Sequence, residues 1–509
     1  MSEILLYYRR PDPTTWVYLS SFLTIGLFFV FRRFWSIRNL DLILLILLAP
    51  GLLIVHEGYR MQVDAALEPA ESAALSEPDL TASALALSSA QPEPITDEIS
   101  IPSPEGGESQ ETPIGEPDSN EQTEPVVDPA ERAQSIQRFG FIYLFVIEMM
   151  ILLRLVIDPL MVRRPLLDPN LTTGGLAFIG VSMFVFMMAN VVRSTPQVQI
   201  EQGPQLGPGY TLMNMLPAIP TRPVSDSPGG SNAPPALEEL NDSQIRLARI
   251  AKTLAITAHL AIVIGIVTIG NRHFGNMRAG IGCGTLYLLV PYTAQMTGRV
   301  DHVLPAALLL WAVLYYRRPW LAGGLLGLAA GLVYYPLFLL PLWTSFYWQR
   351  GIRSFGLGFL TTIGVLILGL MFDGSASLTD QLSYMFGILN PYKSAAELRG
   401  FWALGLNPFW RLPVIVAFLI LSCFYASWPA SKNLATLMSG SAAVMVAAQF
   451  WHGFGGGMYV AWFLPLMLLT IFRPNLQDRI AVKVVPRGKG EALSLVPASR
   501  RVAGEAVSA

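Results

Sequence analysis

Thirteen apolar segments recur along the chain, and the turns between them carry most of the polar residues. A membrane-spanning helix needs about 20 apolar residues, so the longer segments can cross a bilayer. The segments lie at 14–31, 40–56, 139–157, 171–192, 247–270, 279–297, 303–316, 320–333, 336–348, 355–372, 411–428, 434–451 and 457–472. The pair 320–333 and 336–348 is also consistent with one broken helix. The pattern predicts an all-α, polytopic transmembrane bundle of about 11 to 13 spans.

Composition agrees with this prediction. Of the 509 residues, 52% are hydrophobic and only 14% are charged. A soluble domain carries roughly 25% charged residues, so an ordinary soluble enzyme is excluded. The run from Trp16 to Phe31 is followed by two arginines and has no cleavage site after it, so we expect it to remain in the membrane.

Basic residues set the predicted orientation, because cytoplasmic turns of membrane proteins are enriched in lysine and arginine. With the tail after Arg473 in the cytoplasm, almost every inner turn carries a basic pair and the outer turns do not. These inner pairs include Arg32–Arg33, Arg163–Arg164, Arg317–Arg318 and Arg350–Arg353. We therefore expect a multi-pass protein of the cytoplasmic membrane with its N-terminus outside and its C-terminus in the cytoplasm.

Two long outer segments divide the predicted bundle. Residues 57–138 hold 18 of the 36 acidic residues and three basic ones, and 193–246 is rich in proline and glycine. Such compositions cannot bury enough apolar surface to fold alone, so both are expected to be disordered linkers. The acidic linker is a candidate contact for a protein partner. The expected parts are hairpins at 1–56 and 139–192, linkers at 57–138 and 193–246, a core at 247–475 and a basic tail at 476–509.

The short outer turn at 298–302 carries the most concentrated chemistry. Arg299, Asp301 and His302 place a guanidinium, a carboxylate and an imidazole at one predicted membrane boundary. These groups suit acid–base catalysis or phosphate binding. A polar cap on a helical hairpin is an equally weighted alternative.

Two further outer segments hold candidate contacts. The loop 373–410 mixes polar and aromatic residues, which is typical of an amphipathic helix at the membrane interface, and it contains Lys393 and Arg399. An aromatic interface belt explains the same loop equally well. The last outer turn has His452 and three consecutive glycines at 455–457, which permit either close approach to a ligand or a tight turn.

Ionisable residues within the spans form a second group of candidates. Glu148 lies near the middle of its span, and Arg154 is four residues before Asp158, so these last two share a helix face. A polar pathway or a substrate contact is one interpretation, and a polar clamp between helices is favoured over it. His259 follows Arg249 and Lys252 on one stripe that could bind a lipid phosphate, although interfacial snorkelling and a buried histidine are favoured.

Glycines at 323, 327 and 331 are four residues apart, a spacing that lets membrane helices approach closely. The sequence has no phosphate-binding loop, dinucleotide fingerprint, zinc motif or nucleophile elbow, and no nucleic-acid partner is expected. Any catalysis is therefore expected at the outer membrane boundary, with a substrate that arrives from the lipid or from outside.

A family resemblance is carried mainly by residues 298–343 and 451–466. It rests on Asp301 at a helix start, the Arg318–Pro319 turn, the small-residue run 322–329, the proline-rich run 336–341, and a closing segment with Tyr459, Trp462 and Pro465. This pattern resembles GT-C superfamily integral-membrane glycosyltransferases, and most closely the polyprenyl-phosphate-mannose-dependent mannosyltransferases.

The resemblance implies transfer of a hexose, mannose-like, from a polyprenyl-phosphate donor to an extracytoplasmic acceptor. Asp301 would be the catalytic acid or base, with Glu57 as its rival. The implied substrate contacts are Arg299, His302, Lys393, Arg399 and His452. The lipid-linked sugar would be the donor substrate, and a divalent cation is a candidate cofactor.

The competing interpretation is a non-catalytic multipass protein with a degenerate core of this type. It would be a transporter with Glu148 and His259 in a polar pathway, or a scaffold subunit whose acidic linker reaches a partner.

Overall fold

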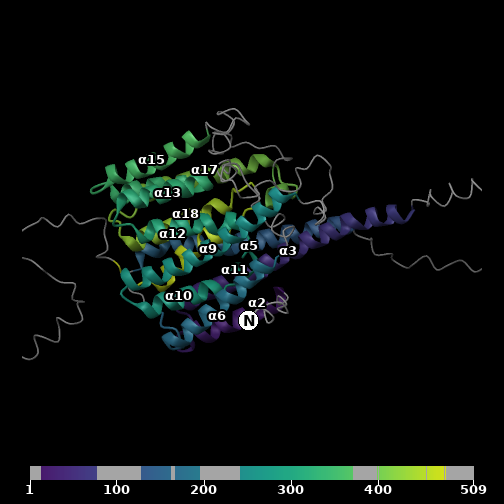
Figure 1. The fold of residues 1–509 in the computed structure, drawn as a ribbon, viewed down its shortest axis with the longest axis horizontal. Coiled ribbons are helices and arrows are strands. Elements are labelled where there is room, and N and C mark those ends of the chain that lie inside the picture. Colours follow the sequence, from purple (N-terminus) through teal and green to yellow (C-terminus); the bar gives the residue numbers. More distant parts are fainter. Residues whose placement is uncertain are drawn as a thin grey trace, which may run out of the picture. The chain divides into compact units, whose positions relative to one another are not determined.

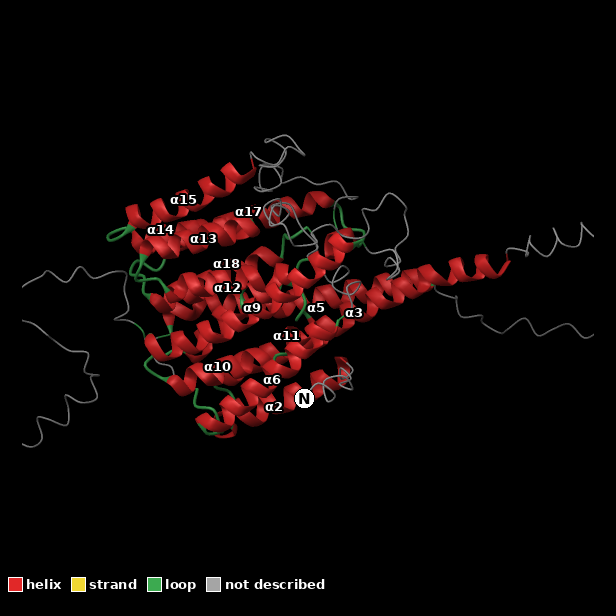
Figure 2. Ribbon diagram, in the orientation of Figure 1, coloured by secondary structure: helices red, strands yellow, loops and turns green. Residues whose placement is uncertain are grey.

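All the regular secondary structure in the described residues is helical. The computed structural model describes residues 13–76, 128–161, 167–194, 241–370, 398, 400–453, 455–474 and 476. No strand occurs among these residues (Figure 2), which confirms the all-α fold class. Most of the two predicted linkers, most of the predicted loop at 373–410 and the basic tail lie outside the described residues. The chain divides into two compact units, Met1–Pro50 with Leu144–Ala509, and Gly51–Tyr143.

Each predicted apolar segment corresponds to one helix or to two short ones (Figure 1). The α-helices are α2 (Pro13–Phe28), α3 (Ile37–Ser76), α5 (Pro129–Ile157), α6 (Thr173–Arg193), α9 (Asp242–Arg272), α10 (Met277–Leu289), α11 (Pro291–Gln295), α12 (Val300–Leu314), α13 (Pro319–Leu332), α14 (Leu340–Tyr347), α15 (Ile352–Leu370), α17 (Arg411–Ser427), α18 (Leu434–Gln449) and α19 (Leu464–Phe472). Short 3-10 turns are η1 (Phe31–Arg33), η2 (Asp158–Leu160), η5 (Tyr335–Leu339), η8 (Gly400–Ala403), η9 (Pro408–Trp410) and η10 (Val460–Trp462).

Five helices in the described residues are long and apolar enough to cross a membrane. They span Ile37–Gln62, Pro129–Leu160, Thr173–Arg193, Ala248–Arg272 and Pro408–Ser427. Shorter apolar helices, including α12, α13 and α18, accompany them. Exposed large apolar side chains lie along these helices, for example Phe178 on α6 and Leu360 on α15. Such surfaces are compatible with lipid rather than water around the protein.

The helices differ from the sequence prediction at both ends of the acidic segment. Helix α3 continues to Ser76 and α5 begins at Pro129, although residues 57–138 were expected to be disordered. Residues 57–76 are rich in alanine, glutamate and leucine, which are strong helix formers. Pro129 suits the first helical position, and the Asp128 carboxylate accepts a hydrogen bond from the Ala130 N–H. Residues 77–127 lie outside the described residues.

A second difference is a break within the predicted segment 279–297. Helix α10 ends at Leu289 and α11 begins at Pro291. Proline has no N–H to donate, so a helix can start at this residue but does not readily continue through it. The short helix α11 that follows the break leads directly to the start of α12.

Helices α13 and α15 pack closely along their small residues, side by side in Figure 1. A Cβ atom added at Gly323 would overlap the backbone carbonyl of Phe355, and one at Gly358 would overlap the backbone of Trp320. A Cβ at Gly327 would lie 3.0 Å from the Phe359 carbonyl oxygen. The glycine spacing noted in the sequence therefore serves helix packing, as expected.

Replacing Gly323 by alanine should destabilise this helix pair. Because the obstructing atoms belong to the Phe355 backbone, the two helices must separate, at a cost of about 1–3 kcal/mol in unfolding free energy. Gly324→Ala is the matched control, since its new methyl group would meet the Thr362 hydroxyl at 3.3 Å and the Gly358 carbonyl oxygen at an ordinary 3.9 Å. Denaturation of both variants in detergent measures the difference, and equal losses would contradict this account of the packing.

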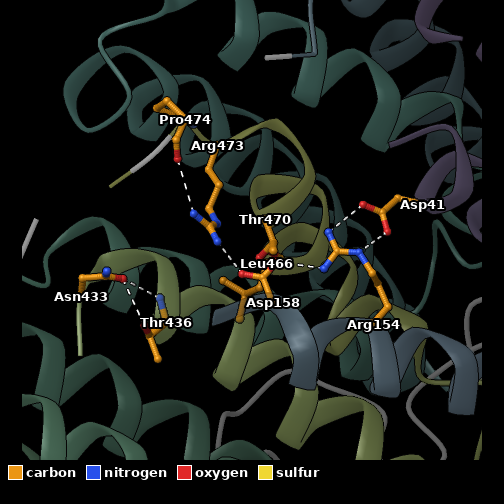
Figure 3. Close-up of polar contacts among 9 residues, drawn as sticks. All are labelled: Asp41, Arg154, Asp158, Asn433, Thr436, Leu466, Thr470, Arg473 and Pro474. Carbon is orange, nitrogen blue, oxygen red and sulfur yellow. Dashed lines mark hydrogen bonds and ion pairs between the residues drawn. The ribbon is translucent and has the colours of Figure 1, made fainter. Parts of the chain in front are cut away.

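Four buried charges form a chain near the ends of α5 and α19 (Figure 3). Arg154 Nε lies 2.7 Å from Asp41 Oδ1, and Arg154 Nη1 lies 2.9 Å from Asp158 Oδ1. Asp158 Oδ2 in turn accepts from Arg473 Nη2 at 2.5 Å. Burial and the nearby Arg154 lower the pKa of Arg473 to about 10, so it stays cationic at neutral pH. The predicted pairing of Arg154 with Asp158 is present, and the clamp extends to two further residues.

Arg154→Met should be strongly destabilising. It removes the cation that two buried carboxylates share, and breaking a buried pair in this way costs about 3–5 kcal/mol. Arg60→Met is the control, because Arg60 pairs with Glu57 where both side chains are largely exposed, and such pairs contribute about 0–1 kcal/mol. Unfolding midpoints measured in bilayer discs should separate the two variants clearly. Similar midpoints would mean that the four buried charges add little to the stability of the folded protein.

Candidate functional site

The candidate site centres on the start of α12. Arg299 lies just before the helix and Asp301 is its second residue. Arg299 Nε donates to Asp301 Oδ1 at 3.1 Å, and Arg299 Nη2 donates to Oδ2 at 2.9 Å. Burial alone lowers the pKa of Arg299, but the Asp301 carboxylate more than offsets this, so the pKa lies above its ordinary value. The guanidinium therefore holds a fully buried carboxylate in a fixed orientation.

His302 lies beside this ion pair. Its Nε2 atom is 3.7 Å from Asp301 Oδ2, and its Nδ1 atom forms a hydrogen bond with the Tyr292 hydroxyl. Tyr292 belongs to α11, so the helix break at Pro291 is what delivers this partner. The sequence analysis did not single out Tyr292. The proline within a predicted span was the available signal.

The last outer turn reaches the same place. The Tyr459 ring stacks on His302 with ring centres 4.3 Å apart, and the His452 ring lies 4.4 Å from Tyr459. Trp462 Nε1 donates to the Asp301 backbone carbonyl at 3.0 Å. Asp301, His302, His452 and Tyr459 are all at most 2% exposed. Residues from two regions about 150 positions apart in the sequence thus form one buried cluster.

Aromatic residues enclose this cluster. Tyr335 from η5 lies 5.0 Å from His452 between ring centres, and 5.3 Å from Trp462. Trp451 packs 5.0 Å from Tyr335, and Arg411 donates from Nε to the Trp451 carbonyl at 2.7 Å. Such walls exclude water, which strengthens electrostatic interactions inside them.

Gln449 fixes the glycine turn that carries Tyr459. Its Oε1 atom accepts hydrogen bonds from the N–H groups of Gly457, at 3.3 Å, and Tyr459, at 3.2 Å. Gly455 and Gly457 have φ angles of +93° and +87°, which only glycine adopts without strain. The glycines were expected either to approach a ligand or to make a tight turn, and the second role is the one seen in the described residues. Sequence reasoning missed Gln449, because a single glutamine in an apolar helix carries no distinguishing pattern.

The candidates Glu57 and Glu148 lie on helices α3 and α5. Glu57 belongs to the unit Gly51–Tyr143, on α3, where it pairs with Arg60 at 2.8 Å. Lys393 and Arg399 lie outside the described residues. Glu148 is fully buried on α5, and neither carboxylate oxygen has a hydrogen-bond partner within the described part of the chain.

Two residues of the predicted stripe on α9, Lys252 and His259, contact other groups of the protein. Lys252 donates to the carbonyls of Val192 and Ser194, at the C-terminal end of α6. His259 is buried, with Nδ1 2.9 Å from the Tyr287 hydroxyl and Nε2 3.1 Å from the Thr297 carbonyl. The buried, hydrogen-bonded histidine was the favoured alternative, and lysine near a helix C-terminus is stabilised by the helix dipole.

Comparison with known proteins gives one finding. Residues 244–468 match the model of glycosyltransferase family 87. No curated protein and no solved structure gives a significant match to the chain. The matched residues contain the whole cluster from Tyr292 to Trp462, and they support a membrane glycosyltransferase. As the sequence resemblance predicted, residues 244–468 are similar to glycosyltransferase family 87, a family of GT-C-type membrane glycosyltransferases.

Proposed function

We propose that this protein transfers a hexose, mannose-like, from a polyprenyl-phosphate donor to an acceptor outside the cytoplasmic membrane. The observation that carries the proposal is the buried Asp301 carboxylate, which Arg299 orients within the family-matched residues. His302 and His452 lie around it. The predicted orientation, with this end of the core outside and the C-terminus in the cytoplasm, belongs to the proposal.

In the proposed step Asp301 is the general base. Its carboxylate takes the proton of the acceptor hydroxyl, whose oxygen then bonds to the anomeric carbon of the donor sugar. The bond from that carbon to the phosphate oxygen breaks, and its electron pair leaves with the lipid phosphate. Arg299 directs the carboxylate, and its positive charge favours the ionised form. His302 and His452 are the described groups placed to contact the sugar or the departing phosphate, and Lys393 and Arg399 remain candidates for the same role.

A divalent cation does not fit the described side chains of this site. No three histidine, cysteine, aspartate or glutamate side chains come together to hold a metal ion in the described residues. Both oxygens of Asp301 already accept hydrogen bonds from Arg299. The proposed step is therefore assigned to the side chains of the chain itself.

Asp301→Asn should abolish transfer. Asparagine cannot accept the hydroxyl proton, so we expect the rate to fall by about 10²-fold or more. The measurement is transfer of labelled sugar from polyprenyl-phosphate donors in bilayer vesicles that contain the purified protein. Glu57→Gln is the control and should retain the wild-type rate, because the Glu57 side chain is 45% exposed and already pairs with Arg60.

Unfolding midpoints of each variant must accompany these rates, since Asp301→Asn also weakens a buried ion pair. Asp301→Glu keeps a carboxylate and should retain part of the rate. Loss of transfer in Glu57→Gln, with transfer intact in Asp301→Asn, would exchange the roles of the two acids.

The second candidate is a non-catalytic membrane protein with a core of this type. The observation in its favour is the closed, two-point contact of Arg299 with a fully buried Asp301, which is also the geometry of a structural ion pair. A folded wild type that transfers no sugar from a panel of lipid-linked donors, together with an Asp301→Asn variant that loses only stability, would favour this candidate.

A further inference from the structure

Arg38 is a buried arginine with two side-chain N–H groups that donate no hydrogen bond to the described residues. It is the second residue of α3 and is 6% exposed. Its Nε and Nη2 atoms have no hydrogen-bond partner in the described part of the chain. These two N–H groups lie along one edge of the guanidinium and point the same way. That edge matches two oxygens of one phosphate or carboxylate group.

The neighbouring acidic residues do not fill this edge. Asp41 and Asp168 are close enough to interact electrostatically with Arg38. Asp41, however, is engaged by Arg154 through two contacts, at 2.7 and 2.9 Å. Asp168 is exposed and makes no hydrogen bond to Arg38. Burial of a charged donor without an acceptor is costly, so the unfilled edge indicates an acceptor that the described residues do not supply.

Hydrogen bonds from the Asn39 side chain fix the turn that precedes Arg38. Asn39 Nδ2 donates to the carbonyls of Val30, Arg33 and Phe34 at 2.9, 3.0 and 3.2 Å. Asn39 Oδ1 accepts from the Val30 N–H at 3.1 Å. The α2–α3 turn, residues 29–36, is therefore fixed against the first helical turn of α3, and Arg38 is held beside it.

The rim of this turn has the composition of a membrane interface. Phe31, Phe34 and Trp35 are 70%, 52% and 85% exposed, and their rings form one cluster with Phe29. Arg32 and Arg33 are exposed within the same turn. Aromatic side chains beside arginines are typical of the headgroup layer, and Arg38 lies where the span-length helix Ile37–Gln62 begins.

We propose that the α2–α3 turn binds the phosphate of an anionic phospholipid headgroup. Arg38 Nε and Nη2 donate to two phosphate oxygens, Arg32 and Arg33 add positive charge, and the aromatic rim lies among the headgroups. The turn lies outside residues 244–468 in the sequence, and this proposal does not depend on the proposed reaction.

The test is lipid binding to the purified full-length protein by native mass spectrometry, with phosphatidylglycerol as the probe. The wild type should retain the lipid, and Arg38→Gln should weaken binding about fivefold. Arg38→Lys keeps the charge but loses the two-pronged edge, so an intermediate loss is expected. Arg353→Gln is the matched control, because Arg353 is also the second residue of an apolar helix, α15, but is exposed.

Two further measurements separate lipid binding from a structural pair with Asp168 and from binding of free phosphate. Asp168→Asn removes a competing carboxylate, so lipid binding should stay the same or strengthen. If Asp168 is instead the partner of Arg38 in the membrane, Asp168→Asn and Arg38→Gln will lose stability equally and neither will change lipid binding, which overturns the proposal. Inorganic phosphate alone should not stabilise the protein as phosphatidylglycerol does, and equal stabilisation would overturn the assignment to a lipid.

If Arg38→Gln does not fold, the proposal is tested with Arg38→Lys instead. Unchanged lipid retention in a folded Arg38→Lys, compared with the wild type and Arg353→Gln, would also overturn the proposal.

Discussion

A charge buried among apolar helices is costly unless a counter-charge lies beside it, and this constraint organises both ends of the core. In the described residues, Arg154 and Arg473 are balanced by Asp41 and Asp158, while Arg299 is balanced by Asp301. The first set joins α3, α5 and the residue after α19, segments that the apolar pattern alone would leave free to slide, whereas Arg299 and Asp301 belong to the start of one helix. Apolar packing between helices is non-directional, whereas these contacts require particular atoms to meet. The ion pairs therefore fix which helices lie together and at what level.

At the α12 end, the same constraint is met within a cluster of ionisable and aromatic side chains around Asp301. Asp301 is held by a guanidinium on one side, and its backbone carbonyl accepts from Trp462 on the other. Tyr459 lies between two imidazoles, with ring centres 4.3 and 4.4 Å from them, and Gln449 holds its backbone. A base for glycosyl transfer needs a fixed direction and a dry surrounding, and both are present around this carboxylate.

The sequence was sufficient to predict the apolar segments, the all-α class and the resemblance to a membrane glycosyltransferase family, because each depends on local composition or on a continuous motif. Arg299, Asp301 and His302 could be nominated since they are adjacent in the chain. Tyr292 and Gln449 could not, because their roles arise only when the break at Pro291 and the glycine turn bring distant segments together. Likewise the four-residue spacing predicted Arg154 with Asp158, but no spacing relates either residue to Arg473.

The contact between Asp158 and Arg473 also bears on where this protein can be divided. The family match covers 244–468, and a boundary drawn there would appear natural from sequence alone. Arg473 follows the last helix of that region, yet its carboxylate partner comes from η2, far upstream of the match. A protein that ends at residue 468 would lose Arg473 itself, and one cut to 244–473 would keep this buried guanidinium without its Asp158 counter-ion. Neither limit of the family match therefore preserves the ion pair that joins η2 to the end of α19.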